Sequence, residues 1–147
     1  MDYTFYTPKD NVSEETKKEI ADFLYEHLDE FGDKHEYIMN CINFALDDVK
    51  KFGGSILVAR DGDKITGAVV MNKTGMSGYI PENILVYIAV HRDYRGKGLG
   101  KKLMLKTFEN SEGNEIKLHV EPENPARFLY EKLGFTSKYL EMRWKRQ

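Results

Sequence analysis

Glycines at alternate positions and a run of basic side chains make the segment from Asn83 to Phe108 the part of the chain best suited to chemistry. It reads NILVYIAVHRDYRGKGLGKKLMLKTF, an apolar stretch followed by a loop with Gly96, Gly98 and Gly100. Glycine has no Cβ atom and lets a ligand approach the backbone. The first N–H groups of a following helix have no internal partner and lie at its positive end, which suits phosphate. Six Lys and Arg residues against one Asp between positions 91 and 106 add positive charge. The sequence therefore predicts a pyrophosphate site.

Two common phosphate-binding motifs do not fit this segment. A P-loop needs Ser or Thr after its Gly-Lys pair, whereas Gly100-Lys101 is followed by Lys102. A dinucleotide fingerprint needs G-x-G-x-x-G and an acidic residue roughly twenty positions later, whereas the glycines here run G-x-G-x-G. A nucleotide-binding protein without these motifs, or a plain strand-to-helix turn, stays open as an alternative.

Two motifs in this chain resemble those of a known superfamily. The segment Val90–Gly100 resembles the R/Q-x-x-G-x-G/A motif of the GNAT superfamily, the acyl-CoA-dependent N-acyltransferases. The segment Leu118–Val120 resembles the superfamily's next strand, and Asn124–Phe135 resembles its N…A…LY…GF segment. The resemblance implies an N-acetyltransferase that moves an acetyl group from acetyl-CoA to a primary amine of a small molecule or peptide, by direct attack in a ternary complex. A non-catalytic acyl-CoA-binding or sensing module is the alternative, because no acidic base stands at the expected position.

The resemblance also implies which residues contact the cofactor. Ile88 and Val90 would offer main-chain partners to the pantetheine arm. Asn124 would contact the cofactor or simply cap a helix, and one side chain can do both. The pyrophosphate would rest on main-chain N–H groups of a continuous run, namely Arg95, Gly96, Lys97, Gly98, Leu99, Gly100 and Lys101.

Proton transfer is assigned by the resemblance to Tyr130 and His119. Tyr130 matches the tyrosine that faces the thioester sulfur in many relatives. A phenol has a pKa near ~10 and a thiol near ~8.5, so donation to a departing thiolate is close in energy; the alternative is a packed tyrosine with a local hydrogen bond. His119 stands where some relatives carry a basic glutamate, and an imidazole can accept the amine proton. Glu82 and Glu121 are weaker candidates for this base.

The residues that would bind the amine acceptor are expected on the first two helices. Their acidic residues would suit a cationic amine, although a pair of solvated helix faces is the simpler explanation. Tyr87 could line the same side. The acidic residues are Asp29, Glu30, Asp33, Glu36, Asp47 and Asp48.

These residues need an α/β (α+β) scaffold. We expect a GNAT-like central mixed, mostly antiparallel sheet of about six or seven strands with about four flanking helices, in the order β-α-α-β-β-β-α-β-α-β. The expected helices run from Ser13 to Gly32 and from His35 to Lys51 with Val49 buried, then follow the glycine loop and the cap at Asn124. The expected strands are Tyr3–Thr7, Ile56–Ala59, Ile65–Asn72 after a hairpin at Asp61-Gly62, Leu85–Val90, Ile116–Val120 and Lys138–Trp144.

Composition sets the remaining limits. The chain has 147 residues and a net charge of −2, which fits one domain over residues 1–147 with no global attraction to nucleic acid or membrane. Cys41 is the only cysteine and no residues have metal-ligand spacing, so we expect no metal. No signal peptide or apolar run of about 18 residues is evident, so we expect a cytoplasmic protein. An exposed edge at Lys138–Trp144 would allow a homodimer.

Overall fold

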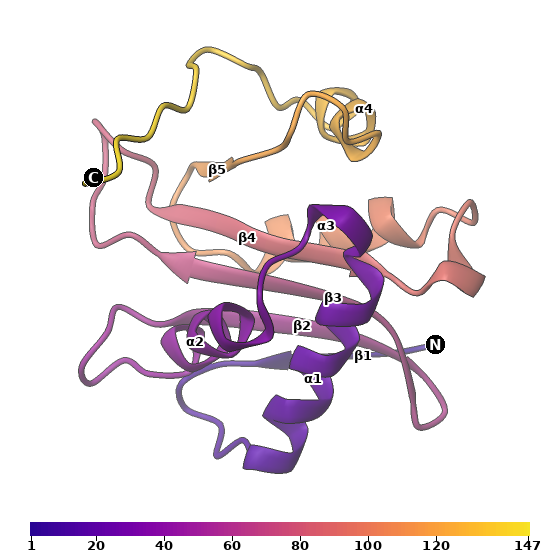
Figure 1. The fold of residues 1–147 in the computed structure, drawn as a ribbon. Helices are drawn as coiled ribbons and strands as arrows, with labels where there is room; N and C mark the ends of the chain where they lie inside the picture. The colour runs from indigo at the N-terminus through magenta and orange to yellow at the C-terminus, as the bar shows by residue number, and fades with distance from the viewer.

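The computed structural model describes residues 1–147 and places one five-stranded sheet between helices. Figure 1 shows the arrangement. The strands are β1 (Asp2–Tyr6), β2 (Gly54–Asp61), β3 (Lys64–Lys73), β4 (Asn83–Val90) and β5 (Ile116–Leu118). The helices are α1 (Glu14–His27), α2 (His35–Ala45), α3 (Leu99–Asn110) and α4 (Ala126–Lys132), with the short 3-10 turns η1 (Asp29–Phe31) and η2 (Arg92–Tyr94).

The sheet has the strand order β1-β2-β3-β4-β5. The first four strands pair antiparallel, and β5 pairs parallel to β4. The helices α1 and α2 cover one face of the sheet, where their buried apolar residues meet Ile56, Val58 and Val70. The helix α3 covers the other face, where its side chains meet Leu57 and Val69. This confirms the expected mixed, mostly antiparallel sheet with helices on both sides.

Local sequence signals explain several element boundaries. Ser13 caps α1, because its Oγ accepts the Thr16 N–H at 3.1 Å. The β2–β3 hairpin turns through Gly62, whose φ of 61° lies in the left-handed region that glycine adopts without strain. On α3, Leu103 and Met104 are fully buried, as their helical spacing predicts.

The first two helices end earlier than expected. The helix α2 stops at Ala45 rather than Lys51, because the Asp47 carboxylate accepts the Val49 and Lys50 N–H groups at 2.9 and 3.1 Å. This local turn competes with helix continuation and leaves Val49 88% exposed, so its predicted burial was wrong. Likewise α1 stops at His27, and Gly32 has an extended conformation.

The predicted last strand, Lys138–Trp144, was also wrong, and the sheet has five strands rather than six or seven. A strand requires a partner along its length, and β5, the edge strand of the sheet, offers only three residues. The apolar side chains of this tail are 75–90% exposed, namely Tyr139, Leu140, Met142 and Trp144. The edge strand on which a homodimer was expected to form is therefore absent.

No helix of the chain combines the length and the apolar character needed to cross a membrane.

Candidate active site

The strand β4 has one edge that is only partly used. It pairs with β3 along its whole length but with β5 only from Asn83 to Leu85. The His91 N–H donates to the Thr66 carbonyl on β3 at 2.8 Å. Because main-chain groups alternate along a strand, those of Ile88 and Val90 face the opposite, open edge. The structure therefore places both predicted pantetheine partners where an extended ligand can reach them.

A β-bulge interrupts β4 next to this open edge. Val70 pairs with Tyr87 and the next residue of β3 pairs with Leu85, so Val86 is an extra residue without a partner in the ladder. Leu85 and Ile88 consequently pack on the α3 side, whereas Val86 and Tyr87 pack on the α1/α2 side. The bulge was not predictable from the sequence, because a continuous apolar run carries no alternation in which a change of phase can be seen.

The glycine loop leads directly into α3. Gly96 and Gly98 have φ values of 78° and 81°, and Gly98 is the N-cap of the helix. A Cβ atom at either position would meet nothing within 4 Å, so backbone conformation rather than space requires glycine in this structure. The first helical hydrogen bond runs from the Lys102 N–H to the Gly98 carbonyl at 3.1 Å.

The N–H groups that precede Lys102 in α3 have no partner within the helix, as predicted. The Arg95 N–H instead makes a long 3.5 Å contact with the Arg92 carbonyl, inside the turn before the loop. Pyrophosphate binding stays a prediction for this run. The structure brings its members together at one end of β4, namely Arg95, Gly96, Lys97, Gly98, Leu99, Gly100 and Lys101.

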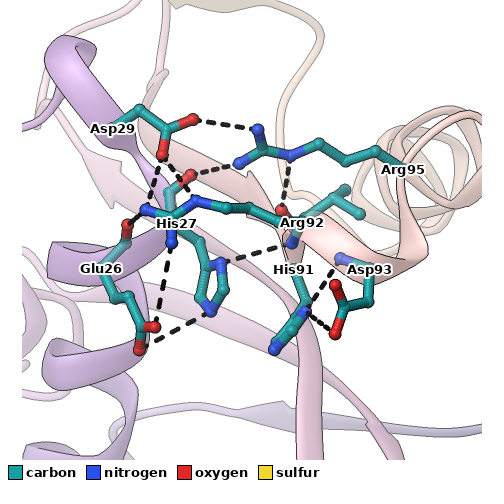
Figure 2. A network of polar contacts seen from close by, with 8 residues as sticks. Glu26, His27, Asp29, His91, Arg92, Asp93 and Arg95 are labelled. Atoms are coloured by element: carbon teal, nitrogen blue, oxygen red, sulfur yellow. Dashed lines mark hydrogen bonds and ion pairs between the residues drawn. The ribbon is translucent and has the colours of Figure 1, made fainter.

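The Arg95 side chain points toward α1 rather than along the loop (Figure 2). Its Nη1 donates to the Asp29 carboxylate at 2.9 Å, and its Nη2 donates to the His27 carbonyl at 2.7 Å. Its Nε donates to the Val90 carbonyl at 3.0 Å. Arg92 bonds the same Asp29 carboxylate at 2.8 and 3.0 Å. The hydrogen bonds from Arg92 and then Arg95 lower the pKa of Asp29, so this carboxylate is held by arginines and is not available to an amine.

Two histidines pack beneath these arginines. The rings of His27 and His91 lie 4.1 Å apart between centroids, and His27 is 5% exposed. The His27 Nδ1 accepts the Arg92 N–H at 3.3 Å, and the His91 Nδ1 accepts the Asp93 N–H at 3.1 Å. Burial, followed by the charge of His91, lowers the pKa of His27. Both imidazoles are therefore used as hydrogen-bond acceptors that support the loop.

Tyr130 lies on the α3 side of the sheet and is 7% exposed. Burial raises its pKa to about 12, with no hydrogen bond from another residue contributing. Its ring packs 5.9 Å from the ring of Phe135. The hydroxyl is thus protonated at neutral pH and has not been taken by a local partner.

The other predicted site residues on the C-terminal side have different surroundings. The Asn124 Oδ1 accepts the Ala126 N–H at 3.0 Å, but the N-cap of α4 is Pro125 rather than Asn124, one residue later than predicted. His119 lies beyond the end of β5 and is exposed, so the predicted strand was two residues too long. The roles of Asn124 and His119 toward a substrate stay predictions.

Several polar residues form a cluster on the α1/α2 side of the sheet, and this cluster was not predicted from the sequence. The Tyr87 hydroxyl donates to the Asp33 carboxylate at 2.5 Å, across 54 positions of sequence. Asn72 donates to the Cys41 Sγ at 3.4 Å, while its own Oδ1 is buried without a partner. Burial, opposed by this hydrogen bond and reinforced by the charge of Asp33, raises the pKa of Cys41 to about 12. No local pattern links these positions, so only the fold could reveal them.

Comparison with known proteins adds independent information. A family model described as an acetyltransferase (GNAT) domain matches residues 52–137. N-alpha-acetyltransferase 30 of Schizosaccharomyces pombe is 34% identical over 82 residues, which cover 53% of this chain and 55% of that protein. The chain spans about half the length of the curated relatives it matches.

Solved structures share the fold over nearly the whole chain. PH1933 from Pyrococcus horikoshii OT3 has a TM-score of 0.68 and 27% identity, covering 96% of this chain and 93% of its own. Aminoglycoside N-acetyltransferase AAC(6')-Iy, solved in complex with CoA, has a TM-score of 0.70 at 13% identity, covering 99% and 94%. The fold predicted from the sequence is confirmed, apart from the number of strands.

Proposed function

Because this chain belongs to the GNAT acetyltransferase family, we propose that it transfers an acetyl group from acetyl-CoA to a primary amine of a small molecule or peptide, by direct attack in a ternary complex. One observation carries the proposal: the open edge of β4 runs without a break into a loop that ends in free helix N–H groups. An extended amide-containing arm and a pyrophosphate fit these two features in the order in which coenzyme A contains them.

The donor would be held mainly by the backbone. The main-chain groups of Ile88 and the N–H of Val90 would pair with the pantetheine arm as an added strand does. The Val90 carbonyl already accepts a hydrogen bond from Arg95. The pyrophosphate would take the N–H groups of Leu99, Gly100 and Lys101 at the positive end of α3. Asn124 would reach the arm from just before α4 while its Oδ1 still accepts the Ala126 N–H.

The reaction then needs a neutral amine, a stabilised oxyanion and a protonated leaving group. Orientation of the amine against a fixed thioester supplies much of the acceleration. Main-chain N–H groups near the end of β4 would donate to the developing oxyanion. Tyr130, protonated because its pKa is raised to about 12, would donate to the departing thiolate, whose own proton affinity also rises in apolar surroundings.

The two reacting groups would approach from opposite faces of the sheet. Tyr130 packs with the α3-side cluster, whereas Tyr87 belongs to the α1/α2-side cluster. The amine would therefore enter beside Tyr87 and Asp33, and the thiolate would leave toward Tyr130. The Asp33 carboxylate offers a cationic amine an attractive charge that Asp29, bound to two arginines, does not.

The general base is proposed to be His119, acting directly or through water. Its exposure lets an accepted proton pass to solvent. The name of the yeast relative, an N-alpha-acetyltransferase, makes peptide N-termini one acceptor class worth testing beside polyamines, amino acids and aminoglycosides.

The first experiment is calorimetric titration of the purified protein with acetyl-CoA, and with CoA and ATP for comparison. Micromolar binding of acetyl-CoA with no response to ATP supports the donor assignment. Release of CoA thiol in the presence of the amine panel then supports catalysis. Binding without turnover on any amine favours the sensing module, and binding of ATP without CoA favours a nucleotide-binding protein. Absence of all binding contradicts the proposal.

A further inference from the structure

We propose that Asp29 is a positioning residue for the cofactor: it holds Arg92 and Arg95 so that the loop between β4 and α3 presents its N–H groups in the geometry that pyrophosphate needs. This inference rests on the proposed function. The Asp29 carboxylate accepts hydrogen bonds from both guanidinium groups, at 2.8 to 3.0 Å, as Figure 2 shows.

The backbone at Asp29 is unusual. Its φ of 54° is the only positive value at a residue other than glycine in the chain. Such a conformation is costly for a side chain with a Cβ atom and persists only where the surroundings hold it. Here it places the carboxylate directly after α1, against the two arginines.

The same arginines close the end of α1. The last carbonyl groups of a helix have no partner within it. Arg92 donates to the Glu26 carbonyl at 2.6 Å, and Arg95 donates to the His27 carbonyl at 2.7 Å. Each guanidinium therefore bridges the Asp29 carboxylate and the helix end, which fixes its orientation at two points.

Arg95 carries this constraint to the sheet and the loop. Its Nε donates to the Val90 carbonyl at the end of β4, and Gly96 follows it immediately in the chain. On the outer side, Cβ positions at Gly96 and Gly98 would have no neighbour within 4 Å. No atom packs against Gly96 or Gly98 on that side, whereas Arg95, the residue directly before Gly96, is held by its bond to Asp29.

Simple electrostatics predicts the opposite effect of Asp29. Coenzyme A is polyanionic, so an acidic residue near its phosphates weakens binding through charge alone. Removing this charge should then tighten binding. If Asp29 positions the loop, removing its carboxylate should weaken binding instead. The sign of the change separates the two roles.

Asp29→Asn and Asp29→Gly test this together. Asparagine tolerates the left-handed conformation, and glycine adopts it without cost, so neither variant adds backbone strain. We expect the Kd for acetyl-CoA to rise about tenfold in both, the value of one charge-assisted hydrogen bond. The rate at saturating acetyl-CoA should stay within about twofold of wild type, since the reacting groups are untouched. The unfolding midpoint of Asp29→Gly should stay close to that of wild type.

Asp93→Asn is the matched control, because it removes one negative charge from the same loop without a bond to either arginine. Its Kd should be unchanged or lower. Unchanged or tighter binding of acetyl-CoA in both Asp29 variants would overturn the proposal. Loss of folded protein in both variants would also overturn it, because Asp29 would then serve stability alone. If wild type itself fails to bind acetyl-CoA, the proposed function has failed rather than this inference.

Discussion

Replacing Gly98 with alanine should destabilise the protein, whereas the same replacement at Gly100 should stabilise it. Gly98 has a φ of 81°, and a Cβ atom there would meet nothing within 4 Å. The cost is therefore that of the left-handed backbone alone, roughly 1–2 kcal/mol. The lower conformational entropy of the unfolded alanine variant offsets about 0.4–1 kcal/mol of this. We expect the free energy of unfolding to fall by about 1 kcal/mol.

Gly100 differs because it lies within the first turn of α3 and has no left-handed backbone. A Cβ atom there would lie 3.4 Å from the Leu129 Cδ2, which is an ordinary contact. Alanine is favoured over glycine within a helix by about 0.8–1.0 kcal/mol. The two variants should therefore move the free energy of unfolding in opposite directions by similar amounts.

Urea unfolding followed by circular dichroism measures both changes, and calorimetry with acetyl-CoA measures the consequence for the site. Gly98→Ala should weaken acetyl-CoA binding, because relief of the strain rotates the N–H groups at the helix start. Gly100→Ala should weaken binding less than Gly98→Ala, because its Cβ atom would point toward Leu129 and its backbone needs no left-handed conformation. A Gly98→Ala variant as stable as wild type would show that the left-handed conformation is not required. Unchanged affinity in a destabilised Gly98→Ala variant would show that the loop does not form the pyrophosphate site.

Three further perturbations test the site. Tyr130→Phe should lower turnover by about 10²-fold or more while changing the Kd for acetyl-CoA little, in line with the loss of a general acid; equal turnover would exclude the phenol from the mechanism. The pKa of His27 is lowered in the folded protein from its usual 6.5, mainly by burial. The unfolded chain therefore takes up more protons as the pH falls through about 6.5, and the free energy of unfolding should decrease between about pH 7 and 5.5. His27→Asn, which stays neutral, should reduce the change of the free energy of unfolding with pH, measured by urea titration. An unaltered pH dependence would show that other groups cause it. Asp33→Asn should raise KM for cationic amines about tenfold with little change in KM for acetyl-CoA. A neutral hydroxylamine acceptor is the control, and its KM should rise much less.

Much of the scaffold was predictable because its signals are local. The hydroxyl of Ser13 marks the start of α1, and the apolar spacing of Leu103 and Met104 marks the buried face of α3. The glycine loop and the segment around Tyr130 carried the resemblance to the GNAT family, which the family model confirms. These features depend on residues within one or two turns of each other.

The parts that failed depend on distant partners or on competition between local structures. The Asp47 carboxylate ends α2 by accepting the N–H groups of Val49 and Lys50. The spacing of apolar residues contains no information about this local turn. The alternation at Lys138–Trp144 fits a strand, but a strand forms only where a neighbour is available.

The candidate site was predictable as a stretch of backbone but not as a set of side-chain contacts. Arg95 was placed correctly in the loop, yet its bond to Asp29 spans 66 positions. The bond between Tyr87 and Asp33 spans 54. Neither pair has a sequence signature, because ion pairs and hydrogen bonds of this kind are set by the packing of elements and not by spacing along the chain.

The bulge in β4 places two consecutive side chains on the same face of the sheet. Val86 and Tyr87 belong to the α1/α2 side, and Leu85 and Ile88 on either side of them belong to the α3 side. Substitutions at the central pair can therefore remodel one wall during evolution while the flanking pair preserves the other. Selection can thus alter the surface on the α1/α2 side without changing the edge of β4 that faces away from β3.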